Sequence, residues 1–285
     1  MKENQSKHAV EKMCNVFKIS RSGYYAWQQR KPSNRQIETC RIKTEIRMIY
    51  TASKNRYGSP KITEKLTNQG WTISRPRVAR MMRSEGLRSI INKKYRCTTT
   101  DSNHSYPVSE NHLGRDFSAS RPGQKWVSDI TYIPTKQGWL YLTIVLDLYD
   151  RKVIGWALSS TMTAKDTVVA AWNMAIRNRP TNRVLFHSDR GVQYASYQFR
   201  KEIKQYDVTQ SMSRKGNCWD NAVAENFFKI LKSEMIYHIR YHSILHAKNE
   251  VFEFIEIWYN RKRIHSYLGY KTPEQYGEIN RSKYA

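Results

Sequence analysis

The spacing of apolar residues changes at Lys125, and this change divides the chain into two parts. Before it, apolar positions recur at helical spacing in short blocks that end at Gly, Pro or polar residues, which predicts small helices. After it, runs rich in Val, Ile, Trp and Tyr alternate with helical blocks, which predicts strands and helices in turn. We therefore expect an all-α N-terminal part and an α/β C-terminal part.

Two pairs of helices are predicted in the N-terminal part, 8–17 with 20–27 and 61–69 with 74–85. A glycine, Gly70, separates the second pair, which has the form of a helix-turn-helix whose second helix can lie in a major groove. The alternative is a helical bundle with a solvated basic face. Four arginines on the second helix are candidate DNA contacts: Arg75, Arg77, Arg80 and Arg83.

The C-terminal part predicts a mixed sheet. Short connections join its first three strands, which therefore form antiparallel hairpins. Alternating helices and strands follow, and this order places helices on both faces of the sheet. The predicted strands are 126–133, 139–147, 152–158, 184–187 and 208–211, and the predicted helices are 164–177, 197–205 and 221–234.

These elements divide the chain into five predicted segments. One of them is rich in Thr, Ser, Asn and Pro, a composition typical of a linker. The segments are an N-terminal helix-turn-helix-like segment (1–35), a second helix-turn-helix-like DNA-binding domain (36–92), the linker (93–121), the α/β core (122–240) and a helical, basic C-terminal extension (241–285).

The net charge indicates a polyanionic partner. Lys and Arg number 49 against 24 Asp and Glu, a net charge of +25. Residues 1–121 hold 25 basic and 9 acidic side chains (+16), and the remaining residues hold 24 and 15 (+9). Because basic side chains displace the counterions condensed on phosphates, we expect the N-terminal part to bind nucleic acid.

Cysteine content and hydropathy narrow the class of protein further. The four cysteines are scattered with no C-x-x-C pair, so we expect reduced thiols rather than disulfides or a cysteine-rich zinc site: Cys14, Cys40, Cys97 and Cys218. No apolar run reaches the roughly 18 residues that span a bilayer, and the N-terminus lacks an apolar signal core. We therefore expect a soluble, cytoplasmic protein that has no membrane partner.

Three acidic residues stand where such a sheet would present a site. Asp129 lies in the first strand, Asp189 follows a short strand that we expect to be parallel, and Glu225 lies one turn into the last long helix. Ligand sites in α/β sheets gather at the carboxyl ends of such strands. Taken singly, each acid has an ordinary structural explanation, such as a capped turn or a solvated helix face.

The blocks around these acids resemble the three catalytic blocks of the insertion-sequence-3 family of bacterial transposases. They read W-V-S-D-I-T-Y, H-S-D-R-G-V-Q-Y and C-W-D-N-A-V-A-E-N-F-F, and 35 residues separate the second acid from the third. The resemblance extends to residues 56–62 (R-Y-G-S-P-K-I), 145–156 (V-L-D-L-Y-D-R-K-V-I-G-W) and 259–273 (Y-N-R-K-R-I-H-S-Y-L-G-Y-K-T-P). It therefore covers nearly the whole chain.

This resemblance implies a ribonuclease-H-like, five-stranded integrase core with a D,D(35)E triad of Asp129, Asp189 and Glu225. The triad would hold two Mg²⁺ (or Mn²⁺) ions, which suit hard oxygen ligands, for two-metal phosphoryl transfer. The implied reaction cleaves element ends, frees a 3′-hydroxyl and joins it to DNA in copy-out-paste-in transposition. The implied partners are double-stranded DNA, comprising terminal inverted repeats and target, further copies of the chain in a synaptic complex, and an upstream OrfA half.

Basic residues near the third acid have two interpretations. Lys229 and Lys232 share a helix face with Glu225. In the family, a basic residue at the Lys232 position contacts the element end, so we favour DNA contact there. For Lys229, a solvated face that pairs with Glu225 is as good an interpretation. A further basic cluster near the C-terminus is expected to touch DNA phosphate or another subunit: Arg261, Lys262, Arg263 and His265.

Other polar residues near the blocks receive mainly structural interpretations. His187 could support the site by orienting water or phosphate, or could be a hydrogen-bonded structural histidine. We expect Asp147 and Asp150 to be structural and Asp220 to cap the last helix at its N-terminus. Core packing is the favoured role of Trp219, and stacking on a DNA base is the alternative.

Two other functions remain open from the sequence. A nuclease of the same fold would hydrolyse DNA or RNA without joining strands. A catalytically inactive relative would bind DNA as a repressor. The helix-turn-helix region and the 35-residue interval disfavour the nuclease, and the intact set of three acids disfavours the repressor.

Overall fold

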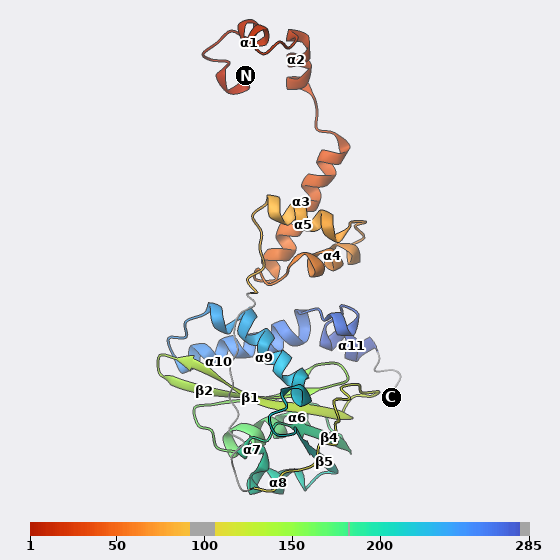
Figure 1. Cartoon of the computed structure of the whole chain (residues 1–285), viewed down its shortest axis with the longest axis vertical. Coiled ribbons are helices and arrows are strands. Elements are labelled where there is room, and N and C mark those ends of the chain that lie inside the picture. Colours follow the sequence, from red (N-terminus) through yellow and green to blue (C-terminus); the bar gives the residue numbers. More distant parts are fainter. Residues whose placement is uncertain (92–105, 182, 280–285) are drawn as a thin grey trace. The chain divides into compact units, whose positions relative to one another are not determined.

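The computed structural model describes residues 1–91, 106–181 and 183–279 of the chain (Figure 1). The chain forms two compact units, Met1–Arg88 and Ser89–Ala285. Within the described ranges, no helix combines the length and the apolar character that crossing a bilayer requires. Two of the four cysteines, Cys14 and Cys40, are free thiols, while Cys97 and the side chain of Cys218 lie outside the description.

The first unit begins with the predicted helical pair. Helix α1 spans Val10–Val16 and helix α2 spans Arg21–Gln29, after a short 3-10 helix, η1, at Lys2–Asn4. The hydroxyl of Ser20 caps α2 by accepting a hydrogen bond from the backbone N–H of Gly23 at 3.0 Å. The two helices agree with the predicted pair, 8–17 with 20–27.

Three further helices complete the first unit, and one of them was not predicted. Helix α3 (Asn34–Ala52) begins at a Ser33–Gln36 capping box, so the predicted boundary at residue 35 falls within its first turn. Helices α4 (Ser59–Asn68) and α5 (Arg75–Ser84) form the predicted helix-turn-helix pair. The three helices enclose a small apolar core of Ile42, Ile46, Ile62, Leu66, Val78, Met81 and Met82.

The second unit is built on the predicted mixed five-stranded sheet, in the order β3-β2-β1-β4-β5. The first three strands pair antiparallel, whereas β4 pairs parallel with both β1 and β5. This combination of hairpins and parallel pairs is the ribonuclease-H-like topology. The strands are β1 (Lys125–Thr135), β2 (Gly138–Asp147), β3 (Val153–Ser159), β4 (Val184–Ser188) and β5 (Val208–Met212).

Helices cover both faces of this sheet (Figure 1). On one face, α6 (Ala170–Asn178), α7 (Val192–Ala195) and α8 (Tyr197–Ile203) enclose an aromatic core that includes Trp126, Trp172, Phe186, Tyr194 and Phe199. A π-helical turn, η2 (Lys165–Val169), leads into α6. The opposite face carries α9 (Ala222–Glu234), α10 (Ile244–Phe252), the π-helix η5 (Glu253–Lys262) and α11 (Pro273–Ile279), with the short 3-10 helices η4 (Ile236–His238) and η6 (Ser266–Leu268).

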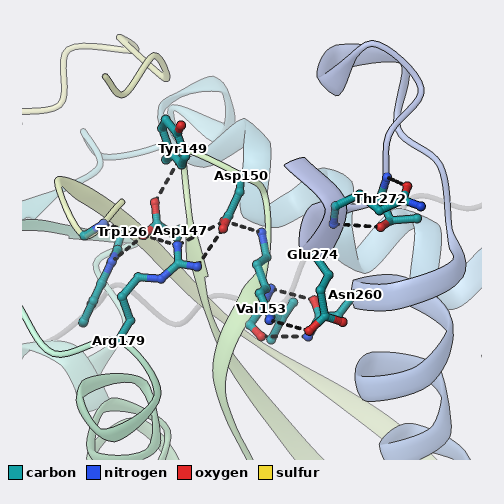
Figure 2. Close-up of polar contacts among 12 residues, drawn as sticks. Trp126, Asp147, Tyr149, Asp150, Val153, Arg179, Asn260, Thr272 and Glu274 are labelled. Carbon is teal, nitrogen blue, oxygen red and sulfur yellow. Dashed lines mark hydrogen bonds and ion pairs between the residues drawn. The ribbon is translucent and has the colours of Figure 1, made fainter. Parts of the chain in front are cut away.

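Two buried aspartates hold the end of β2, in agreement with the structural role expected for them (Figure 2). The guanidinium of Arg179 lies 2.7 Å from Asp147 Oδ2 and 2.7 Å from Asp150 Oδ2. Trp126 Nε1 donates a further hydrogen bond to Asp147. Because each carboxylate is paired and hydrogen-bonded, burial of both is tolerated, and the cluster ties α6 to the sheet.

The predicted linker is partly bound to the sheet. Residues 92–105 lie outside the description, but residues 109–118, which we call the strap, contact β5. Leu113 is buried, and its backbone N–H donates to the hydroxyl of Ser211 at 3.1 Å. The hydroxyl of Ser109 donates to the side-chain oxygen of Gln210. Hydrogen bonds and a buried leucine therefore attach the strap to the sheet edge.

Candidate active site

The register of β1 against β4 brings two of the three predicted acids together. In this parallel pair Val127 lies opposite His187, so Asp129 and Asp189 occupy the equivalent positions two residues further on. Side chains alternate along a strand and neighbouring strands lie about 4.8 Å apart, so the two carboxylates emerge side by side on one face. Asp189 follows the last residue of β4, at the carboxyl end of a parallel strand.

The third acid is delivered by α9, whose start is attached to β1. Asn221, which precedes the helix, is buried, and its amide nitrogen donates to the backbone carbonyl of Ser128 at 2.9 Å. Ser128 is the residue before Asp129, and Glu225 lies one turn into the helix. This hydrogen bond therefore brings the start of α9, and with it Glu225, to the part of β1 that carries Asp129. Asn221 is a positioning residue that the sequence reasoning missed.

The loops after β4 and β5 are joined beside the acids. The backbone N–H of Ser213 donates to the carbonyl of Ser188 at 2.9 Å, and Arg190 Nε donates to the carbonyl of Ser213 at 2.6 Å. Gly191 N donates to Asp189 Oδ1 at 2.9 Å, so the acid is also held by its own loop. The site is consequently assembled on backbone that is hydrogen-bonded on several sides.

The three carboxylates interact electrostatically. Burial raises the pKa of Asp129 well above its ordinary value, and the negative charges of Asp189 and Glu225 raise it further. The pKa of Glu225 is also raised, first by burial and then by the charge of Asp189. Like charges at short range disfavour ionisation of one another. The acids thus converge in one site whose ionised form needs positive charge nearby.

A ligand set for one metal ion needs several donor side chains close together. In the part of the chain that the structure describes, no three His, Cys, Asp or Glu side chains form such a set. The donor chemistry nevertheless fits a hard divalent cation, because the three groups are carboxylates and their mutual repulsion would be relieved by a cation between them.

Comparison with known proteins identifies the domains. An integrase core domain family matches residues 119–218, an HTH-like domain family matches residues 38–95, and a second integrase core family matches residues 225–280. The transposase InsF for insertion sequence IS3A of Escherichia coli (strain K12) is 41% identical over 98% of both chains. The chain belongs to the IS3 family of transposases.

A further relative and two solved structures are also similar to the chain. The uncharacterized 31 kDa protein of insertion element IS600 of Shigella sonnei is 41% identical over 93% of this chain and 97% of that protein. A solved simian T-cell lymphotropic virus intasome with PP2A regulatory subunit B56 gamma has a TM-score of 0.47, at 14% identity over 80% of this chain and 72% of that chain. The HTLV-2 integrase catalytic core domain with magnesium scores 0.43, at 16% identity over 55% and 98%.

These two TM-scores are low, so the fold assignment rests on the strand order and on the domain matches. Both support an integrase core of the ribonuclease-H-like class. This IS3-family transposase is therefore a DNA transposase with a polynucleotidyl transferase fold. The family assignment disfavours both the hydrolysis-only nuclease and the inactive repressor.

The two lysines of α9 differ in their relation to the acids. The positive charge of Lys232 lowers the pKa of Asp129, and its Nζ lies 5.6 Å from the ring centroid of Tyr132. The charge of Lys232 therefore opposes the raised pKa of Asp129. Lys229 is exposed, and no ion pair with Glu225 is present among the residues described. The pairing considered for Lys229 is thus not formed.

His187 occupies a structural position within the transposase core. It is fully buried, and its ring nitrogens lie 2.8 Å from Ser211 Oγ and 3.2 Å from Ser213 Oγ. Burial lowers the pKa of His187 to about 4, so the ring is neutral at physiological pH. The ring links β4 to β5 and its following loop, so His187 supports the site by holding the backbone around Asp189.

Two expectations for the block before α9 were wrong. Asp220 does not cap the helix: it is fully buried, and its carboxylate pairs with Arg214 at 2.9 Å and Arg115 at 2.8 Å. The capping position belongs to Asn221, whose side chain bonds to β1 instead. Trp219 does not pack in the core, because 68% of it is exposed. Partners far along the chain decide both outcomes.

The basic C-terminal cluster is also different from the expectation. Arg263 is buried and pairs with buried Glu234 at 3.0 Å, so it is not available to DNA phosphate. His265 is buried beside it. Arg261 remains largely exposed, with an ion pair to Glu274 at 3.1 Å. Of the two arginines named as DNA contacts here, only Arg261 keeps that possibility.

The arginines of α5 lie mainly on its surface. Arg75, Arg80 and Arg83 are exposed, while Arg77 is partly buried and pairs with Glu38 of α3 at 3.0 Å. The opposite side of α5 packs its apolar residues into the core of the first unit. The helix thus presents a basic face, as expected for a helix that enters a groove.

Proposed function

We propose that Asp129, Asp189 and Glu225 are the catalytic carboxylates of this IS3-family transposase. The main support for this proposal is the register of β1 against β4, because it brings Asp129 and Asp189 next to each other. The Asn221–Ser128 hydrogen bond brings the helix of the third acid to the same place. Mutual effects on pKa support this convergence. The three acids lie in the blocks that carry the family resemblance.

Two Mg²⁺ (or Mn²⁺) ions are the cofactors that these carboxylates would hold. When bound, such ions supply an activated oxygen nucleophile and stabilise the leaving 3′-oxygen in phosphoryl transfer. The chain's own residues orient the carboxylates: Ile130 N donates to Asp129 Oδ1 and Gly191 N donates to Asp189 Oδ1, both at 2.9 Å. Lys232 adds a positive charge beside Asp129, where a DNA phosphate would approach.

The DNA substrates in this proposal are the terminal inverted repeats of an insertion element and a target duplex. The curated relative is named as the transposase for insertion sequence IS3A. Helix α5 would recognise the element end, and exposed Lys229 and half-buried Lys232 of α9 would contact its backbone near the triad. Further copies of the chain and an upstream OrfA half are the proposed protein partners. The proposed DNA contacts are Arg75, Arg77, Arg80, Arg83, Lys229, Lys232 and Arg261.

Mutation of each acid tests the proposal. With a labelled element-end duplex and Mg²⁺, Asp129→Asn, Asp189→Asn and Glu225→Gln should each abolish strand transfer while end binding persists. The matched control is Asp207→Asn, which changes an exposed acid of the same unit. Undiminished strand transfer in Asp129→Asn would overturn the site assignment. If the unmutated protein nicks the duplex but never joins strands, the protein is a nuclease that only hydrolyses DNA.

A further inference from the structure

Trp219 is an exposed tryptophan on the segment that leads into the helix of Glu225. It lies in the 3-10 helix η3 (Cys218–Asn221), directly before α9 and six residues before Glu225. Its exposed fraction is 68%, although tryptophan is the largest apolar side chain and is mostly buried in folded proteins. An exposed tryptophan beside a catalytic site is a feature that the structure of the core alone does not explain.

The two residues that follow Trp219 are anchored. Asp220 accepts hydrogen bonds from Arg214 Nε at 2.9 Å, Arg115 Nε at 2.8 Å and Asn111 Nδ2 at 3.0 Å. We call these four residues the Asp220 clamp. Asn221, the next residue, is attached to β1. Because the two residues after Trp219 are buried and bonded, its side chain is held at the surface rather than free to turn inward.

The Asp220 clamp joins the segment that leads into α9 to the strap. Asn111 and Arg115 belong to the strap, and Arg115 Nη2 also donates to Asn217 Oδ1 at 2.7 Å. The strap itself is bound to β5 through Leu113 and Ser109. Trp219 is therefore presented by a rigid support, which lowers the conformational entropy that binding would cost.

The charge around Trp219 favours nucleic acid. Arg214 and Arg115 keep 54% and 43% of their side chains exposed, and Lys215 is exposed as well. Asp220, the acid between the two arginines, is itself fully buried. An aromatic face with cations at its rim is the combination that binds an unpaired nucleobase and its phosphate. The exposed cations on and beside the segment of Trp219 favour a polyanionic partner over an apolar protein surface.

We propose that Trp219 forms a base-stacking site for a nucleobase that leaves the DNA helix beside the reacting phosphate. The proposal rests on the proposed function, because it takes the triad as the place where the phosphate binds. Stacking accepts any base, so the site would position the DNA end rather than read its sequence. The Asp220 clamp acts through Trp219, and its members are positioning residues.

Photocrosslinking tests the contact directly. Element-end duplexes carry 5-iododeoxyuridine at successive positions around the reacting phosphate, and crosslinked peptides are identified by mass spectrometry after irradiation without Mg²⁺. The expected result is a crosslink to Trp219 at one or two adjacent positions, kept in Trp219→Phe and lost in Trp219→Ala. Tyr197→Ala, which removes another exposed aromatic of the same unit, should leave the crosslink intact. No crosslink to Trp219 at any position would overturn the proposal.

Kinetics supply a second readout. Strand transfer should fall about ten- to a hundredfold in Trp219→Ala and much less in Trp219→Phe, since stacking is worth about 1–3 kcal/mol per base. An abasic nucleotide at the crosslinked position should slow the unmutated protein but not Trp219→Ala, because the two changes remove the same contact. Additive effects of the two changes would contradict base stacking.

Two controls separate this proposal from others. Asp129→Asn should keep the crosslink and lose strand transfer. Normal strand transfer in that variant would overturn the proposed triad but would not contradict the contact between Trp219 and the DNA. If Trp219→Ala instead lowers the mass of the DNA-free protein in light scattering, the tryptophan is a contact between copies of the chain, and the base-stacking site is wrong. Trp219 is exposed, so the variants should keep the melting temperature of the unmutated protein.

Discussion

The carboxylate of Glu234 lies 3.0 Å from the guanidinium of Arg263, and both side chains are buried. Trp258 Nε1 donates to the same carboxylate at 2.9 Å. Glu234 is the last residue of α9, while Trp258 belongs to η5 and Arg263 follows it. The helix that carries Glu225 is thus attached to β1 at its start and to the C-terminal helices at its end. The C-terminal extension is therefore part of what positions the site.

Arg263→Ala should destabilise the core rather than weaken DNA binding. Removing one partner of a buried ion pair leaves the other charge uncompensated, which costs about 3–5 kcal/mol. Arg261→Ala is the matched control, since its exposed pair with Glu274 should contribute less than about 1 kcal/mol. Urea denaturation measures both free energies of unfolding. Reduced DNA affinity with unchanged stability in Arg263→Ala would show that this arginine contacts DNA after all.

Acid should lower stability through Asp220, because the unfolded chain takes up a proton at this carboxylate at a higher pH than the folded protein does. Hydrogen bonds from Arg214 and Arg115 hold the pKa of Asp220 well below its ordinary value, which is about 3.9 in an unfolded chain. A depressed folded pKa gives stability that is present above the unfolded value and is lost as pH falls below it. The urea midpoint should consequently drop more between pH 5 and pH 3 in the unmutated protein than in Asp220→Asn. Equal drops in both would contradict this role for Asp220.

The periodicity of apolar residues was sufficient to predict the strands of the sheet and most of the helices, because strands and amphipathic helices each leave a local pattern in the sequence. The pattern of apolar residues in helix α3 is weaker. Its buried positions, Ile42 and Ile46, share the helix with exposed apolar residues, Ile37 and Met48, so the apolar face is not distinct. The Ser33–Gln36 capping box was the signal that could have located its start.

Long-range pairing explains the residues that were misjudged. Arg263 is buried because Glu234 lies against it, and Asp220 is buried because Arg115, 105 positions away, reaches it from the strap. Whether a charged side chain is solvated depends on such partners, and no local pattern reports them. The proposed triad could be named from the sequence for the opposite reason, since its three acids lie in contiguous blocks that resemble a family.

Gly155→Ala should prevent β3 from packing against α6. A Cβ at this position would lie 2.2 Å from the backbone oxygen of Ala171 and 2.7 Å from the backbone nitrogen of Ala175. Neither backbone atom can move without displacing the helix, so a loss of about 3 kcal/mol or more is expected. Gly269→Ala is the control: nothing lies near its Cβ, and its left-handed backbone, with a φ of 60°, costs alanine about 1–2 kcal/mol. Similar melting temperatures for both variants would contradict the close approach.

Arg80→Ala should weaken binding of the element end and lower its salt dependence. Arg80 is exposed on α5, so loss of one phosphate contact should reduce the slope of log affinity against log salt by about 0.9. Arg77→Ala should also weaken binding, although this arginine shares its charge with Glu38.

The matched control for α5 is Arg41→Ala, which removes the same charge from an exposed position on α3. Titrations at several salt concentrations compare the three variants with the unmutated protein. General electrostatic attraction would lower affinity alike in Arg80→Ala and Arg41→Ala, whereas a helix seated in the groove makes Arg80→Ala the more damaging. If Arg80→Ala and Arg41→Ala show the same affinity and the same slope, α5 is a solvated basic face and another element recognises the DNA.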